Sequence, residues 1–269
     1  MSVDDALTTV ALCTVGLLGL VIGSFLNVVI HRVPLGQSLV APGSSCPACG
    51  TPVRARHNVP VLGWLVLRGR CADCRTTIAV RYPLVELGTA ALFVAVTLRL
   101  GFTPVLPAFL YLTAVAVALA VIDLDVHRLP NAIVLPSYVV GVVLLAPAVV
   151  TGGGLATAGR GLAGAAVLGG LYLGLALARP GAMGFGDVKL AGLLGLNLGV
   201  LGWDALAVGG FGAFLLGGLV TAPLLLTRRA GRRTAVPFGP FMLAAAVLAV
   251  LVATPVADLY LSLLHPASA

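Results

Sequence analysis

The chain consists of long apolar stretches joined by shorter polar connections. A helix needs about 20 mostly apolar residues to cross the hydrocarbon core of a bilayer. Eight stretches satisfy this requirement, at residues 6–30, 83–100, 104–122, 132–150, 161–178, 188–203, 206–227 and 238–263. They lack the alternation of apolar and polar residues that is typical of transmembrane β-strands. The pattern therefore predicts an all-α polytopic membrane protein with about eight transmembrane helices.

The first apolar stretch is predicted to be a transmembrane helix and not a cleaved secretory signal. A signal peptide begins with basic residues and ends at a cleavage site of small residues. This chain instead begins with the acids Asp4 and Asp5, and Arg32 follows the stretch. We therefore expect a first helix in residues 1–30, a loop in residues 31–82 and a core of seven helices in residues 83–269.

The composition agrees with a membrane protein. Of the 269 residues, 59% are hydrophobic and only 9% are charged, and the mean hydropathy is +1.10. A soluble domain carries about a quarter charged residues. The composition therefore excludes an ordinary soluble enzyme.

The basic residues predict how the chain is oriented in the membrane. Only Arg99 and Arg160 lie in connections on one side. The other side carries the remaining basic residues, which are seven arginines in residues 31–82, Arg128, Arg179, Lys189, Arg228, Arg229, Arg232 and Arg233. By the positive-inside rule this second side is cytoplasmic, so both termini are expected outside. The net charge of +7 is then explained by contact with anionic membrane lipid, and we expect no nucleic acid partner.

Two cysteine pairs stand in the predicted loop. Cys46 and Cys49 form one CxxC pair, and Cys71 and Cys74 form the other. Two such pairs can supply the four thiolates of a tetrahedral zinc site. Such a zinc would be structural, because it has no open position for water. Two disulfides are disfavoured in a reducing cytoplasm, and an iron–sulfur or redox role is the other alternative. Cys13, in the first apolar stretch, is interpreted as a small apolar residue.

Four acidic residues lie close to predicted membrane helices on the cytoplasmic side. They are Glu86, Asp123, Asp125 and Asp187, whereas Asp4, Asp5, Asp204 and Asp258 belong to the outer boundary and Asp73 to the loop. Ionisable groups at membrane depth are costly, so each suggests a function. Glu86 is interpreted as a buried polar contact, with Arg81 as a candidate partner, and Asp125 as a turn or capping residue.

Asp123 and Asp187 are the candidates for catalysis. Asp123 ends the third apolar stretch and Asp187 begins the sixth, so both are expected at the cytoplasmic boundary. Two carboxylates at one depth would share a proton. One could then deprotonate a water while the other polarises a peptide carbonyl, which is the chemistry of an aspartic protease. The alternatives are that Asp187 only caps a helix, that the pair serves an ion- or proton-coupled transporter, or that the protein is a non-catalytic zinc-bearing assembly factor.

Motifs along the whole chain match one family. They are residues 23–34, the two CxxC pairs, Asn58-Val59-Pro60, residues 81–86, Ile122-Asp123-Leu124-Asp125, Leu129-Pro130-Asn131, residues 184–189 and Pro237-Phe238-Gly239-Pro240. In this order they resemble the bacterial type IV prepilin peptidases, which are intramembrane aspartyl proteases with a Gly-x-Gly-Asp motif. The family usually has aspartate where this chain has Asn131. That position is not the catalytic one.

The resemblance implies specific roles for these residues. Asp123 and Asp187 would be the catalytic aspartates, and Cys46, Cys49, Cys71 and Cys74 the zinc ligands. The substrates would be precursors of type IV pilins and pseudopilins, cut after the glycine of a short basic leader at the cytoplasmic face of the bacterial inner membrane. Proteolysis would need no metal. The family also implies N-methylation of the new N-terminus with S-adenosylmethionine, although no cofactor motif in the chain supports this independently.

Overall fold

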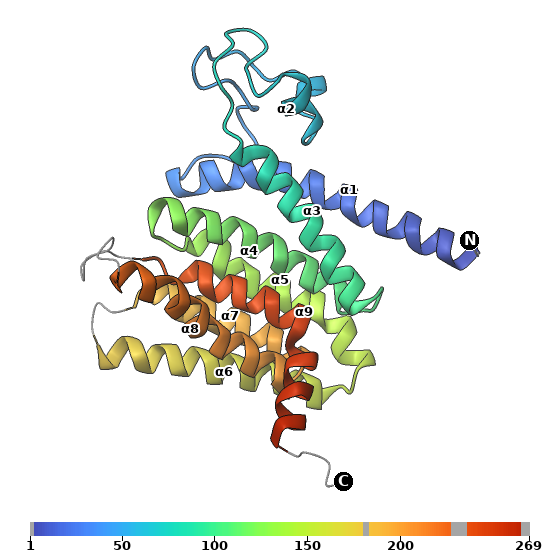
Figure 1. The fold of residues 1–269 in the computed structure, drawn as a ribbon, viewed down its shortest axis with the longest axis vertical. Coiled ribbons are helices and arrows are strands. Elements are labelled where there is room, and N and C mark those ends of the chain that lie inside the picture. The colour runs from blue at the N-terminus through green and yellow to red at the C-terminus, as the bar shows by residue number, and fades with distance from the viewer. Residues whose placement is uncertain (1–2, 180–182, 227–235, 265–269) are drawn as a thin grey trace. The chain divides into compact units, whose positions relative to one another are not determined.

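The computed structural model describes residues 3–179, 183–226 and 236–264. These residues contain the helices α1 (Val3–Arg32), η1 (Val33–Leu35), η2 (Ala55–His57), α2 (Leu62–Val66), α3 (Arg81–Leu100), α4 (Leu106–Val126), α5 (Asn131–Thr151), α6 (Leu155–Ala178), α7 (Phe185–Leu201), α8 (Trp203–Leu226) and α9 (Gly239–Leu264) (Figure 1). None of the described residues forms a β-strand, as the apolar pattern predicts. Arg228, Arg229, Arg232 and Arg233 of the last predicted cytoplasmic connection lie outside the described residues.

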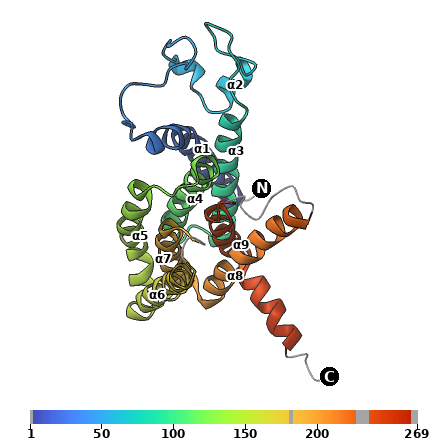
Figure 2. The ribbon, with the colours of Figure 1, turned by 90° about the vertical axis from the view of Figure 1, so that its left-hand side faces the viewer.

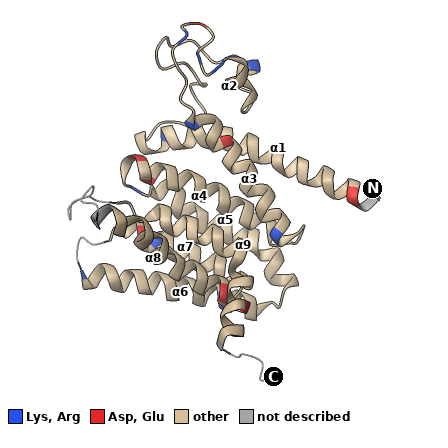
Figure 3. Cartoon of the chain, in the orientation of Figure 1, with Lys and Arg blue, Asp and Glu red and all other residues tan. Residues whose placement is uncertain are grey.

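The long helices coincide with the predicted membrane helices. Seven of them, all but α7, are long and apolar enough to cross a bilayer. Helix α7 has 17 residues, which corresponds to about 25 Å, slightly less than the hydrocarbon core. Charged residues are few along the helices of either part of the chain, whereas several Lys or Arg positions lie in the loop around α2 (Figure 3). The sequence and the fold thus agree on a multi-pass α-helical membrane protein.

The chain forms two compact units, Met1–Gly101 and Phe102–Ala269. In the first unit α1 packs against α3. A Cβ atom on Gly19 would lie 2.6 Å from the Cα of Ala90, and one on Gly23 would lie 2.7 Å from the Cα of Glu86. The two glycines, four residues apart, therefore allow the close helix approach that small residues provide in membranes. The amide of Asn27 also donates a hydrogen bond to the carbonyl of Tyr82 (3.2 Å).

In the second unit α7 is the most deeply buried helix. Residues 190–200 are all buried, and α7 contacts α5, α6, α8 and α9. Figure 1 shows α6 along α7, and Figure 2 shows the same helices after a rotation of 90°. The helix that carries the candidate Asp187 in its first turn is therefore held by its neighbours on several sides.

Glycines fix the contact between α6 and α7. A Cβ atom on Gly195 would lie 2.2 Å from the carbonyl oxygen of Gly164, and one on Gly199 would lie 2.5 Å from that of Arg160. Further along, a Cβ atom on Gly169 would lie 3.5 Å from the Cα of Gly192. The two helices are antiparallel, and their backbones touch where side chains would otherwise separate them. This contact fixes their register.

We predict that a methyl group at this contact destabilises the second unit. In a Gly195→Ala variant the added Cβ meets the Gly164 carbonyl, and such overpacking typically costs about 1–3 kcal/mol. The melting temperature in detergent should therefore fall. The matched control is Gly170→Ala on α6, where a Cβ meets no atom within 4 Å and the better helix propensity of alanine favours the fold. Equal melting temperatures for the two variants would contradict the close contact.

Candidate functional site

The four loop cysteines come together in the first unit. Their sulfur atoms all lie within 4.8 Å of one another, and the Sγ atoms of Cys46 and Cys74 are 3.7 Å apart. A tetrahedral zinc site with Zn–S bonds near 2.3 Å requires sulfur separations of about 3.8 Å. The arrangement that the CxxC spacing predicts is thus present, and the cluster could bind a metal. Cys13 lies apart on α1 and is exposed.

The two cysteine pairs lie in two small turns of the same kind. The amide of Gly50 donates to the carbonyl of Cys46 (2.8 Å), and the amide of Arg75 donates to that of Cys71 (3.1 Å). Gly50 and Arg75 both have positive φ, at 72° and 61°. One isolated bridge closes each turn, between Ser45 and Pro52 and between Arg70 and Thr77. The two halves of the cluster are therefore structural repeats of each other.

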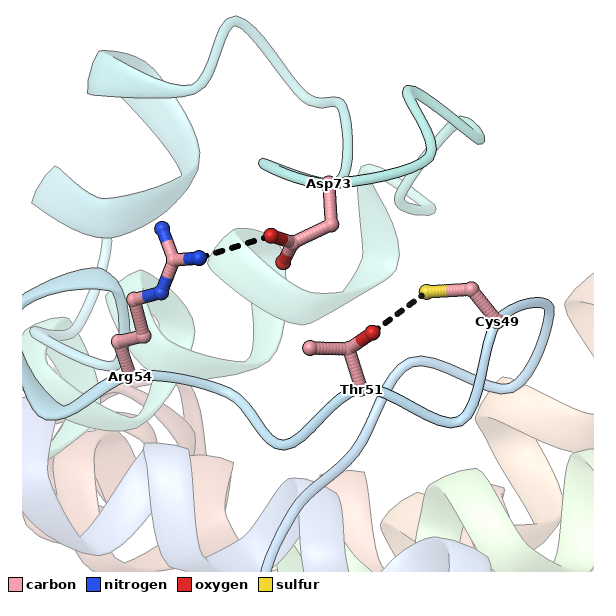
Figure 4. Close-up of polar contacts among 4 residues, drawn as sticks. All are labelled: Cys49, Thr51, Arg54 and Asp73. Atoms are coloured by element: carbon pink, nitrogen blue, oxygen red, sulfur yellow. Dashed lines mark hydrogen bonds and ion pairs between the residues drawn. The ribbon is translucent and has the colours of Figure 1, made fainter.

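A threonine supports the second cysteine of each pair. The Sγ of Cys49 lies 3.4 Å from the Thr51 hydroxyl, and the Sγ of Cys74 lies 3.2 Å from the Thr76 hydroxyl (Figure 4 shows the first pair). Once a thiol has lost its proton, the hydroxyl can donate this hydrogen bond to the thiolate. The hydroxyl of Thr76 accordingly lowers the pKa of Cys74 to about 6, and that of Thr51 lowers the pKa of Cys49.

These threonines are absent from the site residues predicted above. The signal for them is the repeat of Thr two residues after the second cysteine of each pair, at Thr51 and Thr76. An ion pair also links the halves, because the guanidinium of Arg54 donates to the carboxylate of Asp73 at 2.8 Å (Figure 4). Both side chains are partly exposed, so this pair adds little stability.

Glu86 connects α3 to the loop of the first unit. It is buried, and its carboxylate accepts a hydrogen bond from the backbone amide of Val61 (2.6 Å). Val61 has a φ of 61°, which is rare for a β-branched residue. The polar contact expected for Glu86 is therefore made with the Val61 backbone, and the carboxylate holds a strained point of the loop.

Asp123 lies in the last turn of α4. Its side chain is only 5% exposed, and its carboxylate accepts a hydrogen bond from the backbone amide of Gly239 at the start of α9. A Cβ atom on Gly239 would lie 2.5 Å from the Asp123 Oδ2. Glycine at position 239 thus lets the backbone come close enough to donate to this carboxylate. His127, which ends α4 in a left-handed conformation, also interacts electrostatically with Asp123.

Asp187 lies in the first turn of α7. Its Oδ2 accepts a hydrogen bond from the backbone amide of Gly184 (3.2 Å), the residue before the helix. Asp187 therefore caps the helix from its third position. It also interacts electrostatically with Asp123, so the two carboxylates lie in one region of the second unit. Asp187 thus both caps α7 and interacts with Asp123.

Leu129 fills the space between these helix ends. A Cβ atom on Gly186 would lie 3.1 Å from the Cβ of Leu129, and one on Gly239 would lie 3.3 Å from its Cδ2. Leu129 thus contacts the start of α7 and the start of α9, each next to one of the aspartates. Its role was not predicted from the sequence, although it belongs to the Leu-Pro-Asn motif.

Hydrogen bonds tie α5 to α7 beside this region. The ammonium group of Lys189 donates to the side-chain oxygen of Asn131 (3.0 Å), and the hydroxyl of Tyr138 donates to the Lys189 carbonyl (2.6 Å). Asn131 thus gives Lys189 a neutral partner. Asp125, on the last turn of α4, is exposed. Among the predicted acids, Asp123 and Asp187 interact electrostatically with each other.

The fold and the site define a class of protein. The protein is a multi-pass helical membrane protein that has two electrostatically interacting carboxylates at the ends of helices in one unit and a four-cysteine cluster in the other. Comparison with known proteins gives the family: residues 17–100 match the bacterial peptidase A24 N-terminal domain, and residues 109–222 match the type IV leader peptidase family. The chain belongs to the type IV leader peptidase family.

Relatives cover most of the chain. A prepilin leader peptidase/N-methyltransferase of Aeromonas hydrophila is 38% identical over 274 residues, which span 91% of this chain and 92% of the relative. The corresponding protein of Neisseria gonorrhoeae is 35% identical over 268 residues (89% and 90%). That of Myxococcus xanthus is 44% identical over 224 residues, covering 81% of this chain but only 64% of the relative. No solved structure matches the chain.

The family assignment decides between the interpretations that the sequence left open. The resemblance on which the sequence motifs converge is confirmed, and the protein is a membrane-embedded peptidase. The transporter interpretation receives no support from these relatives.

Proposed function

We propose that this peptidase removes the leader from type IV prepilins and pseudopilins, with Asp123 and Asp187 as its catalytic pair. The observation that carries the proposal is the electrostatic interaction of two carboxylates, one at the end of α4 and one at the start of α7, in a chain of the type IV leader peptidase family. The relatives named above are prepilin leader peptidases, which supports the substrate class.

In the proposed reaction, the two aspartates share one proton, because two close carboxylates do not both ionise. The ionised carboxylate takes a proton from water as the water oxygen bonds to the carbonyl carbon, and the other carboxyl protonates the carbonyl oxygen. The tetrahedral diol then collapses. The C–N bond breaks, the nitrogen takes the proton that came from water, and a hydroxyl proton returns to the second carboxylate. The products are a new carboxyl group and a new amine.

We place this reaction at the cytoplasmic face of the bacterial inner membrane, with both termini outside. The charge distribution along the sequence supports this orientation. The substrate would carry a short basic leader ending in glycine, followed by a hydrophobic helix that stays in the bilayer. The cytoplasmic connections of the enzyme are themselves basic. The leader is therefore held by anionic lipid and not by these connections. Residues 83–269 would form the protease core.

We further propose that the four cysteines of the loop in residues 31–82 bind one structural zinc ion. The sulfur separations and the threonine-supported thiols fit zinc. With four protein ligands the ion would supply folding energy to the loop and no activated water.

N-methylation of the newly formed N-terminus is a second proposed activity. The relatives are named N-methyltransferases as well as peptidases, and all four cysteines often linked with that activity are present in this chain. S-adenosylmethionine would supply the methyl group. The described residues contain no glycine-rich turn between a strand and a helix, so no binding site for this cofactor is assigned to them.

We predict that Asp123→Asn and Asp187→Asn each abolish leader removal. Asparagine keeps the size of the side chain but can neither accept nor return the proton, and loss of one member of a unit that acts together typically removes several orders of magnitude of kcat. The assay incubates purified protein in lipid with a prepilin and follows loss of the leader by mass, and the melting temperature of each variant checks folding. The matched control is Asp125→Asn, on the exposed side of the same turn of α4, which should cleave at a rate close to the unsubstituted enzyme. Undiminished cleavage by either catalytic variant would remove that aspartate from the mechanism.

For the metal, we expect the purified protein to contain about one zinc ion per chain and no stoichiometric iron, as measured by atomic emission. Cys74→Ser should lower the zinc content to well below one equivalent after brief exposure to a chelator, because the tetrahedral site loses a thiolate. Cys13→Ser should retain the zinc, since Cys13 lies outside the cluster. Iron in place of zinc, or equal metal content in both variants, would overturn the structural zinc proposal.

A further inference from the structure

Tyr172 is a buried tyrosine on α6. The residue is only 1% exposed. Its ring packs against Phe214 and Phe238, with centroids 5.5 Å and 6.1 Å away. A phenylalanine would fill this aromatic cluster equally well. The phenol also carries a hydroxyl, which can donate one hydrogen bond where a molecule comes within reach.

The register of α6 and α7 places Tyr172 level with the first turn of α7. The antiparallel helices touch at Gly164 and Gly195, and again at Gly169 and Gly192. Tyr172 lies three residues after Gly169 on α6. Because the helices are antiparallel, it stands beside the part of α7 that precedes Gly192 by about three to five residues, which is Asp187 to Lys189. The glycine contact that fixes the two helices therefore also fixes the height of this phenol.

The facing direction of Tyr172 agrees with this register. Tyr172 and Ala191 line the same small cavity, of about 10 Å³. Ala191 is four residues after Asp187, so both lie on one face of α7. Tyr172 also interacts electrostatically with Asp187 itself. The phenol thus faces the side of α7 that carries the candidate aspartate.

The second aspartate is connected to Tyr172 through α9. The ring of Phe238, which contacts Tyr172, immediately precedes Gly239. The amide of Gly239 donates to the carboxylate of Asp123. Tyr172 therefore contacts the residue next to the start of α9 and interacts with the aspartate in the first turn of α7.

We propose that Tyr172 is a third catalytic residue, whose hydroxyl donates a hydrogen bond to the carbonyl oxygen of the scissile peptide bond. The bond strengthens as the carbonyl oxygen gains negative charge during attack by water, before the proton of the carboxyl has fully moved to that oxygen, and the phenol keeps its own proton throughout. A donor positioned before the reaction stabilises the transition state more than the bound substrate. This inference rests on the proposed function, because it adds a group to the aspartate pair.

The test is a Tyr172→Phe variant assayed for leader removal beside the unsubstituted enzyme and Asp187→Asn. Phenylalanine keeps the ring contacts, so the melting temperature should stay within a few degrees of the unsubstituted protein. A lost hydrogen bond to developing charge corresponds to a fall in kcat of about 10- to 100-fold. Because the bond is made in the transition state, KM should change less than about twofold.

Two controls separate the hydroxyl from packing and from tyrosine loss in general. Tyr111→Phe removes a hydroxyl that contacts the Ser137 hydroxyl (3.0 Å). Tyr111 lies twelve residues before Asp123, about 18 Å away along α4, so this variant should leave kcat unchanged. Phe214→Leu loosens the aromatic cluster but keeps the Tyr172 hydroxyl, so it should lower the melting temperature with little effect on kcat per folded molecule.

The outcomes distinguish this inference from the proposed function. If the unsubstituted enzyme cleaves, Asp187→Asn does not, and Tyr172→Phe retains full kcat, the role of Tyr172 is overturned while the aspartate pair stands. The same conclusion follows if Phe214→Leu lowers kcat as much as Tyr172→Phe, because packing then explains both. If Asp187→Asn cleaves normally, the aspartate pair fails, and the inference on Tyr172 fails with it.

Discussion

Helix α7 carries Asp187 in its first turn and continues into the interior of the second unit, so the position of that carboxylate depends on what holds α7. Lipid-facing helices gain no hydrophobic energy from contact with one another. Here α6 and α7 are held by direct backbone contact at Gly164, Gly195 and Gly199, where no side chain could fit. Dispersion forces at such close range are numerous and depend strongly on distance. The register that they set determines which residues of α6 stand beside the first turn of α7.

The first unit uses the same kind of contact for another purpose. Gly19 and Gly23 bring α1 against α3 next to Glu86, whose carboxylate then reaches the Val61 backbone in the loop. Close packing of helices therefore fixes one end of the segment that also carries the cysteines. Within this unit the cluster is closed by its own turns, with matching hydrogen bonds around Cys46 and Cys71. A metal bound there would stabilise the loop, since few apolar side chains in that segment are buried.

Much of this arrangement could be predicted from the sequence, because long apolar runs and paired cysteines are local patterns. The predicted stretch 238–263 matches α9 (Gly239–Leu264) almost residue for residue. The predicted stretch 161–178 starts later than α6 (Leu155–Ala178), because Arg160 interrupts the apolar run. In the structure the Arg160 guanidinium donates to the Val200 carbonyl (3.2 Å) and the helix continues through it. A polar residue that finds a partner on a neighbouring helix cannot be recognised from its own segment.

The same limit explains why parts of the candidate site were missed. Asp123 and Asp187 stand out because charge is rare in membrane helices, whereas Leu129 and Tyr172 look like ordinary core residues. Their positions follow only from the packing of α6, α7 and α9. Thr51 and Thr76 were missed for a different reason, since threonine is common in turns and its hydroxyl matters here only because a cysteine sulfur lies beside it.

Backbone amides supplied at glycines explain how two carboxylates can be tolerated so close to apolar helices. A buried carboxylate is costly unless hydrogen bonds replace its water. Asp187 receives the amide of Gly184, and Asp123 receives that of Gly239, where any side chain would collide with the carboxylate. A backbone donor carries no charge, so it stabilises the carboxylate without forming an ion pair that would hold it away from a substrate. Each aspartate is thus held at a helix end by a neutral donor, which is compatible with the part that the proposed reaction gives to the pair.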